Sequence, residues 1–67
     1  MINNVRALRT ARGLTQADLG QALGVSRQAI IAIEADQHDP SLDLAFKMAA
    51  LFETEVEAIF VNPHRQT

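Results

Sequence analysis

The sequence predicts one all-α domain of five short helices over residues 1–67, and three observations support this prediction. Apolar residues recur three or four positions apart in most segments, as they do along the buried face of a helix. Residues that cap helix starts stand just before such segments: Thr15, Ser26 and Ser41. Residues that end helices or occupy turns separate the segments: Gly13, Gly24 and Pro40. With 67 residues, of which 48% are apolar, the chain is expected to form one small packed core.

The first helix is expected over residues 4–12, and its buried side contains an arginine. One side of this segment carries Ile2, Val5, Leu8, Arg9 and Arg12. A guanidinium within an apolar stripe is costly to bury unless a carboxylate neutralises it, and Glu34 is the expected partner of Arg9. The alternative is that Arg9 extends its side chain to water.

The second and third helices are expected over residues 16–23 and 27–35. Each is preceded by a hydroxyl cap and by an apolar residue that can pack on the first turn of the helix. Gly24 permits a left-handed turn between them, and Gly20 permits a close approach of the two helices. Together they form a helix-turn-helix unit over about residues 15–35; a helical hairpin without a binding function is the alternative.

The outward face of the third helix centres on Gln28 and has Arg27 at its edge, whereas Ile30 and Ile33 point inward. Arginine and glutamine are the side chains that read guanine and adenine in the major groove of DNA. These two residues are therefore predicted to contact base edges. The alternative is an ordinary solvated helix face.

The second half of the chain is expected to hold two more helices. A loop over residues 36–40 leads to a helix over residues 42–52, with Ser41 as its cap. The inner side of this helix carries Leu44, Ala45, Met48, Ala49 and Phe52. A short helix follows over residues 56–60, and the tail, residues 61–67, has no helical pattern.

The formal net charge of −2 argues mildly against a nucleic-acid partner, but the charges are unevenly distributed. Arginines concentrate in the first half of the chain and carboxylates in the second. Such a molecule can present one positive face while it stays acidic overall. Arg6 and Arg12 are candidate phosphate contacts on this face, and a plain solvated surface is the alternative.

Several classes of site are not expected. The chain has no cysteine, and His38 and His64 stand alone, so we expect no metal site and no cofactor. Ser26 and Ser41 have no histidine nearby and are better placed as caps, so we do not expect an enzyme. Without a signal peptide or a long apolar run, the protein is expected in the cytoplasm and not in a membrane. A domain this short buries little surface alone, which favours a homodimer.

Five short motifs occur in order along the chain, at residues 14–16, 26–28, 33–34, 39–42 and 57–60. They read Leu-Thr-Gln, Ser-Arg-Gln, Ile-Glu, Asp-Pro-Ser-Leu and Glu-Ala-Ile-Phe. Together they resemble the Cro/C1-type (XRE-type) helix-turn-helix family of transcriptional regulators, over about residues 3–60, and in particular its short stand-alone members. The resemblance implies a five-helix, lambda-repressor-like domain that binds double-stranded DNA. It also implies a homodimer that represses transcription from a palindromic operator.

The resemblance assigns roles to particular residues. Gln16 matches a glutamine that touches the DNA backbone and braces the third helix, and Arg9 with Glu34 matches an ion pair between the first and third helices. With the phosphate candidates, the expected DNA-binding residues are Arg6, Arg12, Gln16, Ser26, Arg27, Gln28, Ala29, Ile31, Ala32 and Gln37. The expected dimerisation residues are Val56, Ile59, Phe60 and Val61, with a short β pairing between Ile2 and residues 59–61.

Four positions depart from the family pattern. Asp36 and Gln37 replace a glycine and a lysine after the third helix, which removes one phosphate contact and adds a carboxylate near the DNA. Glu53 replaces a helix-ending glycine, so a less sharp end of the fourth helix is expected. Ile31 stands where a polar residue is usual, and can face either a thymine methyl group or a protein. An antitoxin-like or anti-regulator module that binds a protein partner is therefore the alternative function.

Overall fold

Five helices follow one another in the computed structural model, which describes residues 1–65. They are α1 (Val5–Ala11), α2 (Gln16–Leu23), α3 (Arg27–Glu34), α4 (Leu42–Leu51) and α5 (Val56–Ile59). The all-α prediction is confirmed, and each observed helix end lies within one residue of the predicted end. The last two residues of the predicted tail, 66 and 67, lie outside the described residues. Within residues 1–65, no helix is both long and apolar enough to cross a lipid bilayer.

Three of the helices begin at the hydroxyl caps that the sequence predicted. Ser26 accepts a hydrogen bond from the Ala29 N–H at 3.1 Å, and Ser41 caps α4 in the same way. Thr15 forms a reciprocal capping box with Asp18, in which each side chain accepts from the backbone N–H of the other residue. Each cap satisfies a backbone donor that a helix leaves without an internal partner. The start of α3 is therefore determined locally.

Four helices end in the same way, with a residue in the left-handed backbone conformation. Gly13 and Gly24 follow α1 and α2 at φ 69° and 73°. Asp36 and Glu53 follow α3 and α4 at φ 61° and 55°. After each of these residues, the next N–H donates to a carbonyl five residues back, at 2.9–3.1 Å. The expectation that Glu53 makes the end of α4 less sharp is wrong, because the hydrogen bonds of the turn are present without a glycine.

The helices enclose one core, to which every helix contributes a buried residue. Its fully enclosed side chains are Val5, Leu19, Ile30, Ile33, Met48 and Ile59. Two members of the predicted inner side of the first helix do not lie in this core. Ile2 is 66% exposed because it precedes α1, and Arg12 is exposed because α1 ends before it.

The two ends of the folded domain lie against each other. Asn3 and Phe60 form an isolated antiparallel bridge. On either side of it, the Asn4 N–H donates to the Ile59 carbonyl at 2.8 Å, and the Val61 N–H donates to the Ile2 carbonyl at 2.9 Å. The predicted pairing of the termini is therefore present within one chain, as a single bridge and not as a strand.

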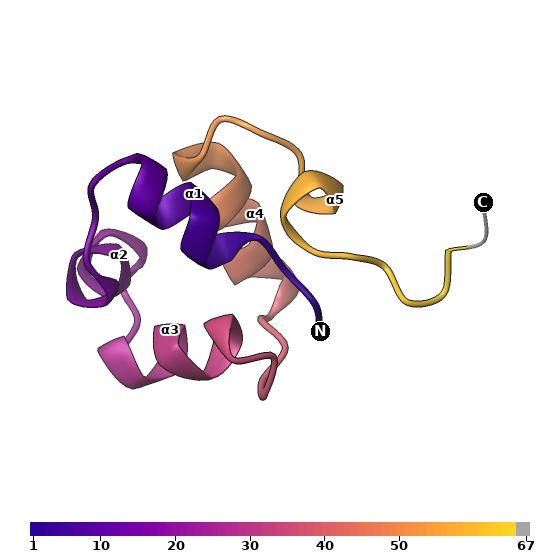
Figure 1. Cartoon of the computed structure of the whole chain (residues 1–67), viewed down its shortest axis with the longest axis horizontal. Helices are drawn as coiled ribbons and strands as arrows, with labels where there is room; N and C mark the ends of the chain where they lie inside the picture. Colours follow the sequence, from indigo (N-terminus) through magenta and orange to yellow (C-terminus); the bar gives the residue numbers. More distant parts are fainter. Residues whose placement is uncertain (66–67) are drawn as a thin grey trace.

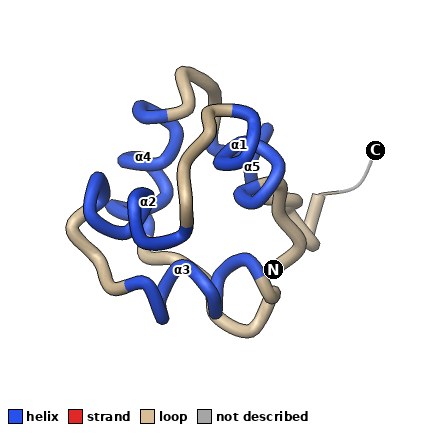
Figure 2. Tube along the Cα trace, turned by 60° about the vertical axis from the view of Figure 1, so that its left-hand side comes forward, coloured by secondary structure: helices blue, strands red, loops and turns tan. Residues whose placement is uncertain are grey.

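The arrangement leaves α3 along one edge of the molecule (Figures 1 and 2). In both views α1 and α4 lie on one side of α3, and no other helix covers its opposite side. The α2–α3 turn is tight because Gly20 has no side chain: a methyl group there would lie 2.8 Å from the Val25 carbonyl oxygen. The prediction of a close approach at Gly20 is confirmed, and α2 thereby sets the position at which α3 begins.

We expect Glu53→Gly to raise the free energy of unfolding by about 0.5–1 kcal/mol, as measured by urea denaturation. The substitution removes the steric cost of a side chain at positive φ. This gain is partly offset because glycine gives the unfolded chain more backbone freedom. Asp36→Gly is the matched comparison, and it should gain less because the Asp36 carboxylate accepts a hydrogen bond from Asn3 at 2.9 Å. A lower stability of Glu53→Gly would contradict this interpretation of the turn.

Candidate nucleic-acid interface

The face of α3 that points away from the core is open to solvent in the single chain. Arg27 and Gln28 are exposed, whereas Ile30 and Ile33 on the opposite face are 0% and 1% exposed. The prediction that the first two side chains point outward is confirmed. Ala29, Ile31 and Ala32 are half-buried at the borders of this face, and Gln37 is exposed in the loop that follows α3. No element of residues 1–65 closes the face off (Figure 2).

An ion pair joins α1 to the C-terminal end of α3, as the sequence predicted. Arg9 Nε donates to Glu34 Oε2 at 2.7 Å, and Arg9 Nη2 donates to Glu34 Oε1 at 3.2 Å. The exposed fractions of the two side chains are only 10% and 6%. Two parallel hydrogen bonds fix both the distance and the orientation of the pair. The alternative, in which Arg9 extends to water, is wrong.

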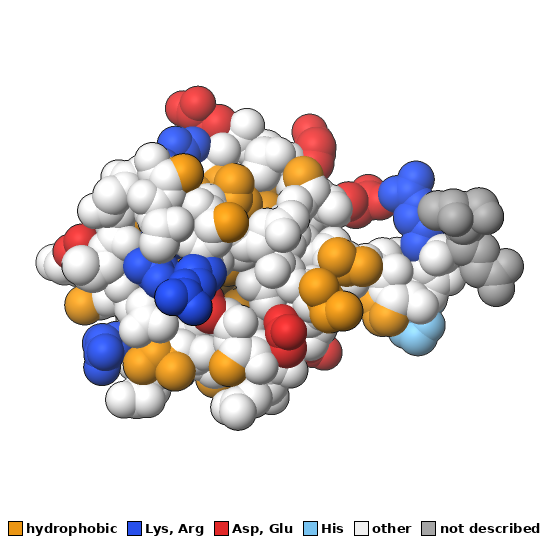
Figure 3. Space-filling model, in the orientation of Figure 1, with side chains coloured by type: hydrophobic (Ala, Val, Ile, Leu, Met, Phe, Trp, Pro, Cys, Tyr) orange, Lys and Arg blue, Asp and Glu red, His pale blue; other side chains and the backbone are white. Residues whose placement is uncertain are grey.

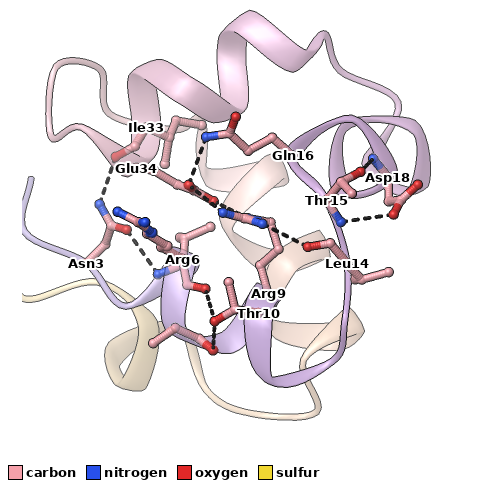
Figure 4. A network of polar contacts seen from close by, with 12 residues as sticks. Asn3, Arg6, Arg9, Thr10, Leu14, Thr15, Gln16, Asp18, Ile33 and Glu34 are labelled. Carbon is pink, nitrogen blue, oxygen red and sulfur yellow. Dashed lines mark hydrogen bonds and ion pairs between the residues drawn. The ribbon is translucent and has the colours of Figure 1, made fainter.

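The same ion pair also forms hydrogen bonds with α2 and with the α1–α2 turn. Gln16, at the start of α2, donates to Glu34 Oε1 at 3.2 Å, and Arg9 Nη1 donates to the Leu14 carbonyl at 2.8 Å. Figure 4 shows these side chains converging on the Glu34 carboxylate from two helices. The carboxylate therefore holds the end of α3 to α1 and to α2.

Burial and hydrogen bonding act in opposite directions on Glu34. Burial raises the pKa of its carboxyl group, but the hydrogen bonds from Arg9 and Gln16 and the positive charges of Arg9 and Arg6 outweigh this effect. The net result is a pKa below the ordinary value of 4.5. The hydrogen bond to Glu34 raises the pKa of Arg9 in turn, against the opposing effect of its burial. Both groups are charged at neutral pH.

A shallow hollow of about 410 Å³ lies beside this network, between α1 and α3. It is lined by Arg6, Arg9, Gln16, Ile31, Glu34 and Ala35. Arg6 is exposed at its rim, and Figure 4 shows the Arg6 and Arg9 side chains both reaching from α1 toward α3. Figure 3 shows basic side chains gathered over this region, and acidic side chains around the edges of the face and at its lower right. The surface around the hollow is therefore locally positive although the chain is acidic.

The structure separates Arg12 from the other candidate DNA-binding residues. Its guanidinium lies 5.7 Å from the centre of the Phe52 ring, where α1 and α4 end. Figure 1 shows these two helix ends on the side of the molecule away from α3. Arg6 and Gln16, in contrast, line the hollow beside α3. The Ser26 hydroxyl is engaged as the cap of α3.

The candidate dimerisation residues fall into two groups. Ile59 and Phe60 are 0% and 5% exposed, so they belong to the core of the single chain and present almost no surface to a second copy. Val56 is half-buried, and Val61 is 50% exposed beside Ile2. The exposed apolar surface at this end of the domain therefore comes from the residues that flank the terminal bridge.

One polar residue that links α1 to α3 was not predicted. Asn3 Nδ2 donates to the Ile33 carbonyl at 2.8 Å and to Asp36 Oδ1 at 2.9 Å, while Asn3 Oδ1 accepts from the Val5 N–H at 3.0 Å. The last of these bonds is local, because an asparagine side chain readily accepts from the backbone N–H two residues further on; it is not a cap of α1, whose N-cap is Asn4 without a side-chain cap bond. Nothing local indicates the bonds to α3, because their partners are about thirty positions away along the chain.

The chain is similar in sequence to known helix-turn-helix proteins. A family model described as Helix-turn-helix matches residues 5–59. An uncharacterised HTH-type transcriptional regulator of Methanocaldococcus jannaschii is 52% identical over 61 residues, which cover 91% of this chain and 92% of that protein. The HTH-type transcriptional regulator YgzD of Bacillus subtilis is 42% identical over 60 residues, covering 90% and 91%.

The fold is also similar to that of a solved structure. The restriction-modification controller protein C.AhdI from Aeromonas hydrophila superposes with a TM-score of 0.76 at 33% sequence identity, over 85% of this chain and 86% of that protein. The five helices thus have the lambda-repressor-like arrangement that the resemblance implied.

We expect Glu34→Gln to lower the free energy of unfolding by about 3 kcal/mol, because it leaves the buried Arg9 guanidinium without a counter-charge. Asp43→Asn is the control: it breaks the exposed pair with Lys47 (3.3 Å), which contributes at most about 0.5 kcal/mol. Chemical denaturation of both variants measures the difference. Equal stabilities would show that the buried pair contributes nothing specific.

The lowered pKa of Glu34 predicts an acid-dependent loss of stability. The folded-state pKa lies below the unfolded value, so the stabilisation is complete above pH about 5 and is lost as the pH falls through the folded-state value. Urea midpoints measured from pH 7 to pH 3.5 should therefore decrease, and the decrease should be smaller for Glu34→Gln. The hydrogen bonds from Thr15 lower the pKa of Asp18 as well, from its ordinary value of 3.8. Protonation of Asp18 therefore lowers the stability of the wild type and of Glu34→Gln alike. Parallel curves for the two proteins would contradict the assignment to Glu34.

Proposed function

This chain belongs to the helix-turn-helix family, and we propose that it is a transcriptional repressor that binds a palindromic operator as a homodimer. The observation that carries the proposal is the exposed face of α3, where Arg27 and Gln28 project from the N-terminal turn. In a helix-turn-helix protein, the N-terminal residues of the second helix contact base edges in the major groove. Arg27 then reads guanine, and Gln28 reads adenine or guanine.

The surroundings of α3 support contacts to the DNA backbone. Arg6 lines the hollow beside α3, and Gln16 stands at the start of α2, where backbone N–H groups have no partner within the helix. Hydrogen bonding to Glu34 holds the Gln16 side chain on the same side as α3. We therefore assign Arg6 and Gln16 to phosphate contacts and exclude Arg12, which stacks on Phe52.

A homodimer supplies the second recognition helix that a palindromic operator requires. In such a complex the two copies of α3 lie about one helical turn of DNA apart, roughly 34 Å. The exposed apolar residues Ile2 and Val61 flank the terminal bridge and offer a surface for a second copy. Ile59 and Phe60 act indirectly, since their burial in the core holds the bridge in place.

We expect Gln28→Ala to abolish the preference at one base pair in each half-site while affinity for random DNA changes little. A bidentate contact to a base discriminates by about 1–3 kcal/mol, but it contributes nothing to sequence-independent binding. Sequences selected from a random pool by the wild type and by the variant measure the change. Gln21→Ala, at an exposed position of α2, is the matched control and should keep the wild-type preference. Equal losses on selected and random DNA would contradict a base-reading role.

A salt titration of the same complexes distinguishes DNA binding from the protein-binding alternative. The logarithm of the DNA association constant should fall linearly with the logarithm of salt concentration, with a slope of about −0.9 for each phosphate neutralised. If no DNA is bound even at low salt, the DNA-binding proposal fails; an apolar interface with a protein partner, in contrast, need not weaken as salt rises.

We expect Val61→Glu to convert the dimer to a monomer that still folds. A carboxylate at this 50% exposed position becomes buried and unpaired at the dimer contact, but stays solvated in the monomer. Sedimentation equilibrium gives the mass, and circular dichroism gives the helix content. Phe46→Glu, at a 58% exposed position on α4, is the control and should leave the dimer intact. A dimer that survives Val61→Glu would place the contact elsewhere.

A further inference from the structure

Ile31 is an apolar residue beside the exposed face of α3. The first turn of that face carries the polar residues Arg27 and Gln28. Ile31 follows Arg27 by four residues and Gln28 by three, so it lies one turn along the same side of the helix. The side chain is half-buried and lines the hollow with Arg6 and Gln16. Part of it is therefore still exposed on the same side as the two residues proposed to read bases.

The charges around Ile31 indicate the kind of molecule that covers it. Arg6 lies across the hollow and Arg27 lies one turn away, and both are exposed. The nearby carboxylate of Glu34 is neutralised by Arg9 at 2.7 Å and has an exposed fraction of only 6%. The charged groups that line the hollow, together with Arg27, therefore leave a net positive surface around an apolar side chain, and such a surface attracts a polyanion.

Double-stranded DNA combines both properties in its major groove. The groove is lined by phosphates, and the one apolar group on its base edges is the 5-methyl group of thymine. Along a helix with a rise of about 1.5 Å per residue, Ile31 lies about 4.5 Å beyond Gln28. For a helix that runs along the groove, this separation spans one or two base-pair steps, since successive bases are about 3.4 Å apart.

We infer that Ile31 makes this protein selective for thymine, one or two base pairs from the pair that Gln28 contacts, by packing on the 5-methyl group. The inference rests on the proposed DNA binding and names one element of the operator. The contact removes the exposed part of the isoleucine and the methyl group from water together, which favours thymine over the other three bases at that position.

The test replaces thymine by uracil, which removes the methyl group and leaves the hydrogen-bonding groups unchanged. An operator duplex selected by the wild-type protein is prepared with each thymine changed singly to deoxyuridine. Affinities are measured by fluorescence anisotropy for the wild type, for Ile31→Ala and for Phe46→Ala. Phe46 is exposed on α4 and serves as the control for shortening an apolar side chain.

At one thymine in each half-site, deoxyuridine should weaken binding of the wild type and of Phe46→Ala by about fourfold, the change typical of losing one buried carbon. The same replacement should leave the affinity of Ile31→Ala unchanged. Each protein is compared with itself on two duplexes, so a smaller folded fraction of a variant does not change the ratio of its two affinities.

Two different failures are distinguishable. If selection returns an operator but no thymine methyl group matters, or if Ile31→Ala keeps the full dependence, the inference about Ile31 is overturned while the DNA-binding proposal stands. If no sequence is enriched and no duplex binds at low salt, the proposed function fails and the inference falls with it.

Discussion

The ion pair between Arg9 and Glu34 is the interaction on which the exposed face depends. A carboxylate and a guanidinium with side-chain exposures of 6% and 10% are each costly to bury alone, so neither is tolerated without the other. Their two hydrogen bonds also require a defined orientation, which an apolar contact would not. Since Gln16 donates to the same carboxylate, one charged group sets the positions of α1, α2 and α3 together.

The third helix needs this support because it is intrinsically weak. It has only eight residues, and three of them are isoleucines, whose branched side chains lose rotamer freedom in a helix. A helix of this length is not stable alone in water. Its conformation comes from the cap at Ser26, from burial of Ile30 and Ile33, and from the contacts of Asn3 and Glu34 at its far end. The exposed face of α3 is therefore only as well defined as the core beneath it.

Local charge and net charge differ in this molecule for a structural reason. The chain carries a formal charge of −2, and its carboxylates lie mostly in the second half. Glu34 is the carboxylate nearest the hollow, and Arg9 neutralises it there. Arg6 and Arg27 remain exposed on the same side, so a polyanion approaching α3 meets a positive surface. An acidic composition is thus compatible with a nucleic-acid partner.

The sequence alone determined the helices, their caps and the outward direction of Arg27 and Gln28, because periodicity and capping act within a few residues of each other. It also predicted the Arg9–Glu34 pair, since a charge within an apolar stripe demands a partner. Only the tertiary structure decided the contacts of residues whose neighbours are distant in sequence. In it Arg12 lies over Phe52, Asn3 bonds to the end of α3, and Ile59 and Phe60 are buried within one chain. Such contacts depend on how helices meet in space, and a one-dimensional pattern does not contain that information.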